Sequence, residues 1–111
     1  MEITTREVSD AVVVLEIAGD IDIYNTGDLK TIINKVVEDG KKHIVFDMSQ
    51  VPYIDSSGIG ALIATLTKLK KAGGSLKIIR AHDSVKKVFE LTKMTSFFEI
   101  YDSEEEAMEK I

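Results

Sequence analysis

The stretch "IVFDMSQVPYIDSSGIGAL", residues 44–62, decides the fold. It begins with a short apolar run, Ile44 to Phe46, whose length and β-branched residues predict a buried strand. A helical pattern then runs from about Ser56 to Lys71 and ends at Gly73-Gly74. The apolar face predicted for this helix consists of Ile59, Leu62, Ile63, Leu66 and Leu69. A strand that leads directly into a helix indicates an α/β sheet, in which ligands and partners gather where strands end and helices begin.

Two strands and a helix are predicted upstream of this unit. Residues 3–8 and 12–18 have strand composition, and Ser9-Asp10 between them predicts a tight turn, so the two strands are expected to pair as a hairpin. The helix is predicted to start at Asn25 or Thr26 as its cap and to end at Gly40. Its apolar residues recur with helical spacing at Leu29, Ile32, Ile33, Val36 and Val37.

Downstream, residues 76–79 and 97–101 predict two more strands. Ser84 is expected to cap the short helix between them, whose inner face is Val85, Val88 and Phe89. Ser103 and Glu106 form a capping-box pattern before a final helix with an apolar side at Ala107, Met108 and Ile111. The order β-β-α-β-α-β-α-β-α predicts one α/β domain over residues 1–111. Its mixed sheet has an opening antiparallel hairpin and then parallel β-α units, packed with about four helices.

Composition narrows the class of function. The chain has 111 residues, a net charge of −5 and no cysteine, so a disulfide, a thiol nucleophile and a cysteine-ligated metal are excluded. This cysteine usage is compatible with the reducing cytoplasm, and neither a signal peptide nor a membrane-spanning stretch is expected. A mildly acidic chain is also a poor nucleic-acid binder. We therefore expect proteins or small molecules as partners, and neither nucleic acid nor a membrane.

A catalytic reading of "DSSGIG", residues 55–60, finds little support. A hydrolase nucleophile elbow requires Gly-x-Ser-x-Gly, and the order here is different. The chain has only two histidines, His43 at the start of a strand and His82 in a loop, and nothing in the sequence aims either at Ser56. No catalytic residue is assigned, and the chain is not expected to be an enzyme.

Two phosphate-related alternatives remain open. Gly58-Ile59-Gly60 begins a dinucleotide-binding pattern, but Ile63 stands where its third glycine belongs. A nucleotide or anion could still bind at the start of the helix. A phosphoaspartate receiver would use Asp20 and Asp22 as an acid pair and Asp47 or Asp55 as acceptor, although no lysine follows the last strand. Neither pattern predicts a bound cofactor or metal.

The remaining readings concern the helix start itself. Asp55 or Ser56 could cap the helix by accepting hydrogen bonds from its first N–H groups. Those N–H groups and the positive end of the helix dipole would also tolerate a phosphate on Ser56. A phosphoserine would add roughly −1.5 to −2 charges beside Asp55. A like-charge contact at ~5 Å and an effective dielectric of ~20 costs on the order of 3 kcal/mol, which is about a hundredfold in affinity if a partner sits on this surface. Phosphorylation could therefore abolish binding without changing the fold.

At these residues the sequence resembles the STAS domain family, named for sulphate transporters and anti-sigma factor antagonists. The resemblance covers essentially the whole chain. It rests on "GDID" at residues 19–22, on the long match at residues 44–62, and on Gly73-Gly74 before a strand. It is strongest to the free-standing bacterial antagonists, also called anti-anti-sigma factors.

The resemblance implies a switch between protein partners. In the family the serine after the aspartate of Asp-Ser-Ser-Gly is phosphorylated, which here is Ser56. The unphosphorylated protein would bind an anti-sigma factor that is also a serine kinase, and so release a sigma factor to RNA polymerase. ATP is used by that kinase, and a metal-dependent serine phosphatase would reset the switch. By resemblance the partner surface comprises Asp20, Asp22, Tyr24, Asp55, Ser57 and Gly58.

One departure from the family concerns "YNTG" at residues 24–27, where many members carry small residues. Tyr24 is therefore expected either to tune the choice of partner or to pack locally. Two other functions stay open: a small-molecule binding domain, and a STAS regulator of a different signalling assembly.

Overall fold

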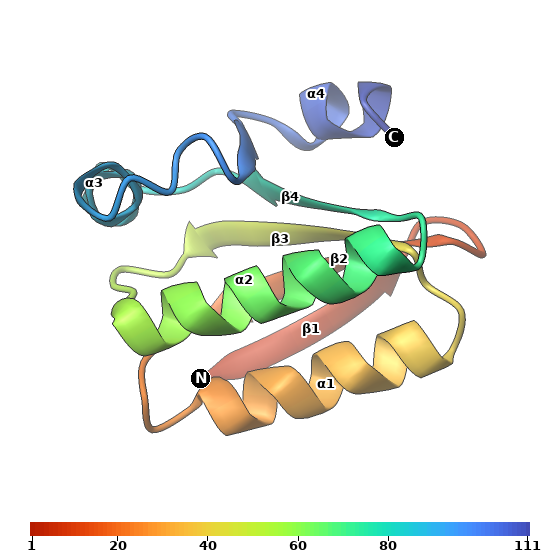
Figure 1. Ribbon diagram of the computed structural model, residues 1–111, viewed down its shortest axis with the longest axis horizontal. Coiled ribbons are helices and arrows are strands. Elements are labelled where there is room, and N and C mark those ends of the chain that lie inside the picture. Colours follow the sequence, from red (N-terminus) through yellow and green to blue (C-terminus); the bar gives the residue numbers. More distant parts are fainter.

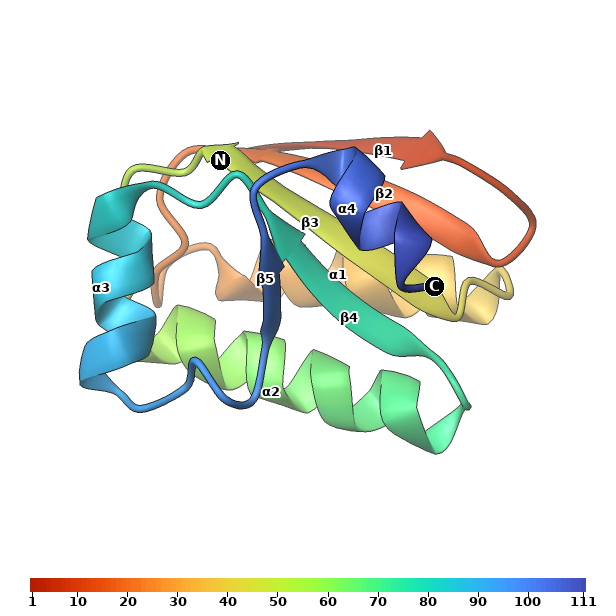
Figure 2. The same cartoon turned by 90° about the horizontal axis from the view of Figure 1, so that it is seen from above.

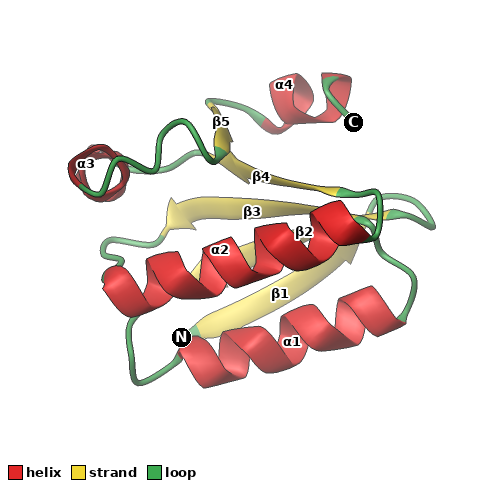
Figure 3. Ribbon diagram, viewed as in Figure 1, coloured by secondary structure: helices red, strands yellow, loops and turns green.

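The computed structural model describes all residues, 1–111, as a five-stranded mixed sheet with the order β1-β2-β3-β4-β5 (Figures 1 and 3). β1 pairs with β2 antiparallel, and the remaining neighbours pair in parallel. The strands are β1 Glu2–Glu7, β2 Val12–Ala18, β3 His43–Gln50, β4 Ser75–Ile79 and β5 Glu99–Tyr101. This arrangement confirms the predicted fold class and supplies the strand order, which the sequence did not reveal.

Four helices connect and cover the strands: α1 Thr26–Glu38, α2 Ser56–Lys71, α3 Asp83–Leu91 and α4 Glu104–Glu109. α1 and α2 lie side by side on one face of the sheet, and α4 lies over the opposite face (Figures 1 and 2). Both α1 and α2 start at the rim where β2 and β3 end. None of the four helices is long and apolar enough to cross a lipid bilayer.

The main core fills the space between the sheet and the helices α1, α2 and α3. It is built from alternate residues of the strands, such as Ile44 and Phe46, and from the inner faces of the helices. Phe89 of α3 and Phe98 pack with their ring centroids 5.4 Å apart, which closes the core at the α3 end of the sheet. The intervening residues of the strands face the other way, where a small cluster of Val14, Val45 and Ile79 is covered by Ala107 of α4.

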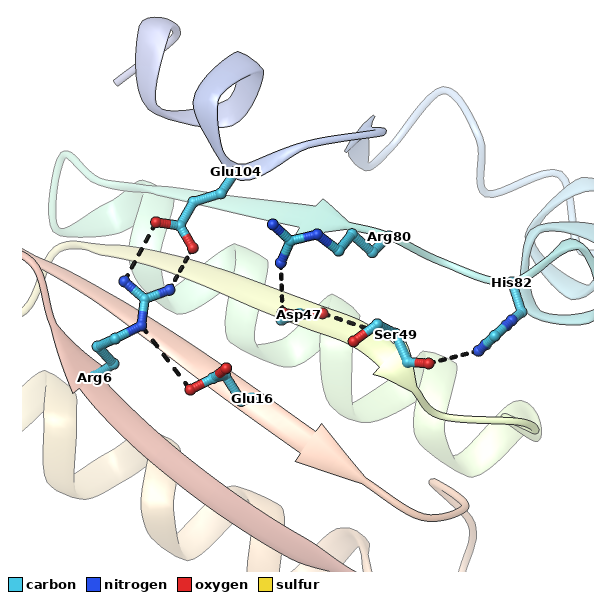
Figure 4. A network of polar contacts seen from close by, with 7 residues as sticks. All are labelled: Arg6, Glu16, Asp47, Ser49, Arg80, His82 and Glu104. Atoms are coloured by element: carbon cyan, nitrogen blue, oxygen red, sulfur yellow. Dashed lines mark hydrogen bonds and ion pairs between the residues drawn. The ribbon is translucent and has the colours of Figure 1, made fainter.

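That second face of the sheet is otherwise polar and cross-linked by charged side chains (Figure 4). Arg6 of β1 forms ion pairs with Glu104 of α4 and with Glu16 of β2. Asp47 of β3 is buried, and its carboxylate accepts hydrogen bonds from the Arg80 guanidinium at 2.8 Å and from the Ser49 N–H at 3.0 Å. A buried carboxylate is stable only with such partners, so Asp47 has a structural role and holds the end of β3.

The structure corrects several details of the sequence-based expectations. β3 continues to Gln50, well past Phe46, because Arg80 and Ser49 compensate the charge of Asp47 inside the strand. Ile63 is 36% exposed and lies off the inner face of α2. Ser84 does not cap α3, since His82 is at the cap position and the Ser84 hydroxyl donates to the Pro52 carbonyl instead.

The last strand and last helix are also smaller than expected. β5 begins at Glu99, so Phe97 and Phe98 precede it, with Phe97 largely exposed and Phe98 in the core. Half of the capping box predicted before α4 is present: the Ser103 hydroxyl accepts from the Glu106 N–H at 3.2 Å, but the Glu106 carboxylate does not accept from the Ser103 N–H. Ile111, expected on the apolar side of α4, lies beyond its end and is exposed.

Candidate functional site at the start of helix α2

Two chain segments meet at the rim where β2 and β3 end, and they carry every residue predicted for the site. One is the loop from Asp20 to Asn25, and the other runs from Tyr53 into α2. They join through a parallel bridge between Ile21 and Ile54. The Ile21 N–H donates to the Tyr53 carbonyl at 3.0 Å, and the Asp55 N–H donates to the Ile21 carbonyl at 3.1 Å. Asp22 and Ser56 therefore lie at one rim of the sheet.

Asp55 links the two segments through its side chain. It occupies the N-cap position of α2, where one carboxylate oxygen accepts from the Gly58 N–H at 3.0 Å. The other oxygen accepts from the Ile23 N–H at 3.2 Å. The sequence left open whether Asp55 or Ser56 caps the helix, and the structure assigns the cap to Asp55. One carboxylate therefore both starts the helix and holds the neighbouring loop against it.

Gly58 is required by the close packing of these segments. A side chain at this position would place its Cβ 2.6 Å from a side-chain carbon of Ile54 and 2.9 Å from the carbonyl oxygen of Ile21. Both distances are too short for non-bonded atoms, and one of them involves backbone. The glycine thus lets the first turn of α2 lie directly against the loop.

The loop from Asp20 to Asn25 is held by its own polar side chains. The Asp22 carboxylate accepts from the Tyr24 N–H at 3.0 Å. The Asn25 side-chain oxygen accepts from the Asp22 N–H at 2.9 Å, and its amide donates to the Asp20 carbonyl. Asn25 occupies the N-cap position of α1 but makes no side-chain cap bond, so the predicted capping role is replaced by closure of the loop.

Ser56 is the first residue of α2 and is exposed to solvent. Its hydroxyl makes no hydrogen bond within the chain, and the same holds for the half-buried Ser57. The helix end is already capped by Asp55, so the Ser56 hydroxyl is not needed for the fold. The Ser56 hydroxyl is therefore accessible to another protein.

The surface around Ser56 combines exposed apolar groups with uncompensated acids. Tyr24 is 93% exposed, which excludes the local packing considered for it, and Ile23 and Tyr53 are 66% and 50% exposed. The two segments and the first turn of α1 carry four aspartates that form no ion pair: Asp20, Asp22, Asp28 and Asp55. The sequence did not single out Ile23 and Tyr53, because an apolar residue next to a strand end is normally buried.

The two histidines, His43 and His82, lie away from Ser56 and make structural contacts. The imidazole of His43 lies 2.8 Å from the Ser75 hydroxyl at the opposite end of the strands. Burial lowers the pKa of His43, and Lys77 and Lys42 lower it further. The ring of His82 donates to the Ser49 carbonyl at 2.6 Å. No three His, Asp or Glu side chains gather closely enough to hold a metal ion.

The shape of the site also differs from that of a small-molecule pocket. The hollows of the surface lie between α1 and α2, on the open face of the sheet and beside α3, and none is lined by residues 53–60. Small ligands usually bind in concave, mostly apolar pockets. A rim without a hollow that carries exposed aromatic side chains is the form expected of a protein–protein contact.

Comparisons with known proteins agree with this geometry. The STAS domain profile matches residues 3–107. An anti-sigma-B factor antagonist of Bacillus subtilis is 30% identical over 86 residues, which cover 78% of each chain. The crystal structure of an anti-sigma factor antagonist from Mycobacterium paratuberculosis is 29% identical, covers 99% of this chain and 94% of that one, and superposes with a TM-score of 0.84.

The phosphorylated form of the Bacillus cell fate determinant SpoIIAA shares the fold, with a TM-score of 0.75 at 19% identity over 98% of both chains. The profile match spans nearly the whole chain and includes both segments of the rim. The chain therefore belongs to the STAS domain family.

Proposed function

We propose that this protein is an anti-sigma factor antagonist whose binding is switched off by phosphorylation of Ser56. The observation that carries the proposal is the free, exposed hydroxyl of Ser56 beside a protruding aromatic and acidic surface. Relatives that cover most of the chain are themselves anti-sigma factor antagonists. The unphosphorylated protein would bind an anti-sigma factor with serine kinase activity in the cytoplasm and thereby free a sigma factor.

The surface suits a partner with an apolar pocket surrounded by basic side chains. Tyr24 is the protruding anchor, held in place by the bonds that Asp22 and Asp55 make to the loop backbone. Aromatic anchors at the centre of an interface contribute much of its binding energy. The unpaired carboxylates around it favour fast, salt-dependent association with a basic surface.

The switch is a phosphoryl transfer that the partner would catalyse. The Ser56 oxygen attacks the γ-phosphorus of the ATP held by the kinase, the bond from that phosphorus to the bridging oxygen breaks, and ADP leaves. The hydroxyl proton passes to a base on the kinase. A serine phosphatase would reverse the modification by hydrolysis and release inorganic phosphate. This chain supplies the acceptor and its position, and we propose no cofactor of its own.

The phosphate would weaken binding through charge and not through unfolding. It adds roughly −1.5 to −2 charges at a helix start that tolerates anions. Repulsion from Asp55 is present in the free protein as well, so affinity would fall only through negative groups of the partner that face Ser56, namely the nucleotide phosphates in the kinase site. One like-charge contact at ~5 Å and an effective dielectric of ~20 costs on the order of 3 kcal/mol, or about a hundredfold in affinity.

The test uses the ATP-binding anti-sigma factors encoded in the source genome, each expressed and purified, with calorimetry as the readout. We expect one of them to bind wild-type protein and the Ser56→Ala variant with similar affinity. Its affinity for the Ser56→Asp variant should be much lower. Equal affinity for all three proteins would overturn the switch. Circular dichroism of each variant separates loss of binding from loss of fold.

A further inference from the structure

Gly60 is a glycine that the fold does not require. It lies inside α2 and is exposed, and a Cβ built on it meets no atom within 4 Å. Gly58, two residues earlier, differs in this respect, because its Cβ would collide with Ile21 and Ile54. A glycine in an exposed helix interior lowers helix stability relative to alanine. No contact within the chain requires a glycine at this position.

The position of Gly60 relates it to Ser56. Residues four apart lie one turn apart on the same face of a helix, so Ser56, Gly60 and Ala64 follow one another along α2. Ala64 in turn lines a groove of about 250 Å³ between α1 and α2. Gly60, which has no side chain, therefore lies between the proposed phosphorylation site and this groove on the same face of α2.

The groove has an apolar floor and a basic rim. Ile33 and Ala61 form its floor, and Lys30 and Lys68 stand on its two sides. Lys68 donates to the Asn34 side-chain oxygen at 2.8 Å, and neither lysine forms an ion pair. The charge of this end of α2 is thus opposite to that of the acidic rim around Ser56, about 18 Å away by the helical rise.

We infer that the partner surface extends from Ser56 over Gly60 into the α1–α2 groove, and that an acidic segment of the anti-sigma factor occupies it. This inference rests on the proposed function. Gly60 allows the backbone of that segment to approach the helix closely, next to the residue that is phosphorylated. Lys30 and Lys68 pair with its carboxylates. Because the two ends of the surface have opposite charge, the partner can dock in only one direction.

The experiment measures the affinity of the same purified anti-sigma factor for a panel of variants. Gly60→Ala is expected to raise Tm by about 4 °C, since it removes a helix-interior glycine. Gly60→Gln folds equally well but is expected to lose at least about tenfold in affinity, because its side chain occupies the contact. Thr67→Gln enlarges an exposed side chain further along α2 and serves as the control with unchanged affinity.

A second arm tests the charge of the groove. The double variant Lys30→Glu/Lys68→Glu is expected to lose about fivefold or more in affinity, and the loss should shrink at about 0.5 M salt. Lys87→Glu/Lys93→Glu makes the same change in net charge at exposed positions away from the groove. Equal losses in both double variants would show a net-charge effect and overturn the groove contact.

The outcomes separate this inference from the proposed function. If Ser56→Asp loses the partner while Gly60→Gln and the groove variant bind like wild type, the extended surface is wrong and the switch stands. If wild-type protein binds none of the anti-sigma factors, both are overturned. Loss of affinity in Gly60→Gln with a Tm at or above that of wild type supports the contact.

Discussion

The Asp55 carboxylate accepts a hydrogen bond from the backbone N–H of Ile23, 32 residues away along the chain, at 3.2 Å. The same carboxylate caps α2 through Gly58. The Asp55 side chain therefore joins the loop that presents Tyr24 to the helix that presents Ser56, in addition to the backbone bonds between Ile21 and residues 53–55. A phosphate on Ser56 would be placed beside this junction, so the proposed modification site and Tyr24 lie on one connected surface.

Substitution of Asp55 should separate its two roles. Asp55→Asn retains an oxygen that can accept from Gly58 but loses the acceptor for Ile23, with an expected cost of about 1 kcal/mol in unfolding free energy. Asp55→Ala loses both bonds and should cost about 2 kcal/mol. Urea denaturation measures the cost, and amide hydrogen exchange reports on the loop. An Ile23 amide that stays equally protected in both variants would contradict the proposed link.

The two glycines of α2 should respond to alanine in opposite directions. Gly58→Ala is expected to lower the unfolding free energy by about 1–3 kcal/mol, because the new methyl group overlaps Ile54 and the Ile21 carbonyl. Gly60→Ala should raise it by about 0.5–1 kcal/mol, because its methyl group enters open space. Thermal and urea unfolding of the pair provide the measurement. Destabilisation of equal size in both variants would show that the effect of Gly58→Ala does not come from its close contact with Ile54 and Ile21.

Tyr24 should matter for binding and not for folding. Its side chain is 93% exposed and makes no hydrogen bond through its hydroxyl, so Tyr24→Ala should leave the urea midpoint within error. As a central aromatic anchor it should cost about 2 kcal/mol in affinity for the anti-sigma factor. Phe97→Ala, another exposed aromatic outside the rim, is the control. Unchanged affinity in Tyr24→Ala would remove Tyr24 from the partner surface.

Acid should destabilise the protein through His43. Burial lowers the pKa of this imidazole in the folded state, and Lys77 and Lys42 add to the effect. The unfolded chain therefore binds a proton that the folded chain does not. The corresponding stability is complete above about pH 6.5 and is lost as the pH falls from there through the lower pKa of the folded protein. His43→Gln should flatten this part of the stability curve, and an NMR titration of His43 at or above pH 6.5 would refute the assignment.

Elements with a strong periodic pattern could be predicted from the sequence. The limits of β2 and α2 were predicted correctly, and the hairpin, the parallel units and the position of the site at one rim followed from the order of elements. The N-cap role of Ser103 was also predicted, because Ser103 and Glu106 lie within one turn. These features depend on local chemistry.

The features that were missed depend on contacts between distant segments. The length of β3 could not be predicted because the partner of Asp47, Arg80, lies 33 residues away. Ile63 and Ile23 are exposed although apolar, and Ile23 is held by the bond of its N–H to Asp55, 32 residues away. Lys77 is buried within the sheet and pairs with Glu99 on the edge strand, which no local pattern indicates.

The most direct test of the account is phosphorylation with the purified anti-sigma factor kinase and ATP, followed by site mapping and calorimetry. We predict one phosphate, located on Ser56, and an affinity for that kinase lowered by about a hundredfold while the circular dichroism spectrum is unchanged. A phosphate at another residue, or full affinity after complete modification of Ser56, would contradict the central claim.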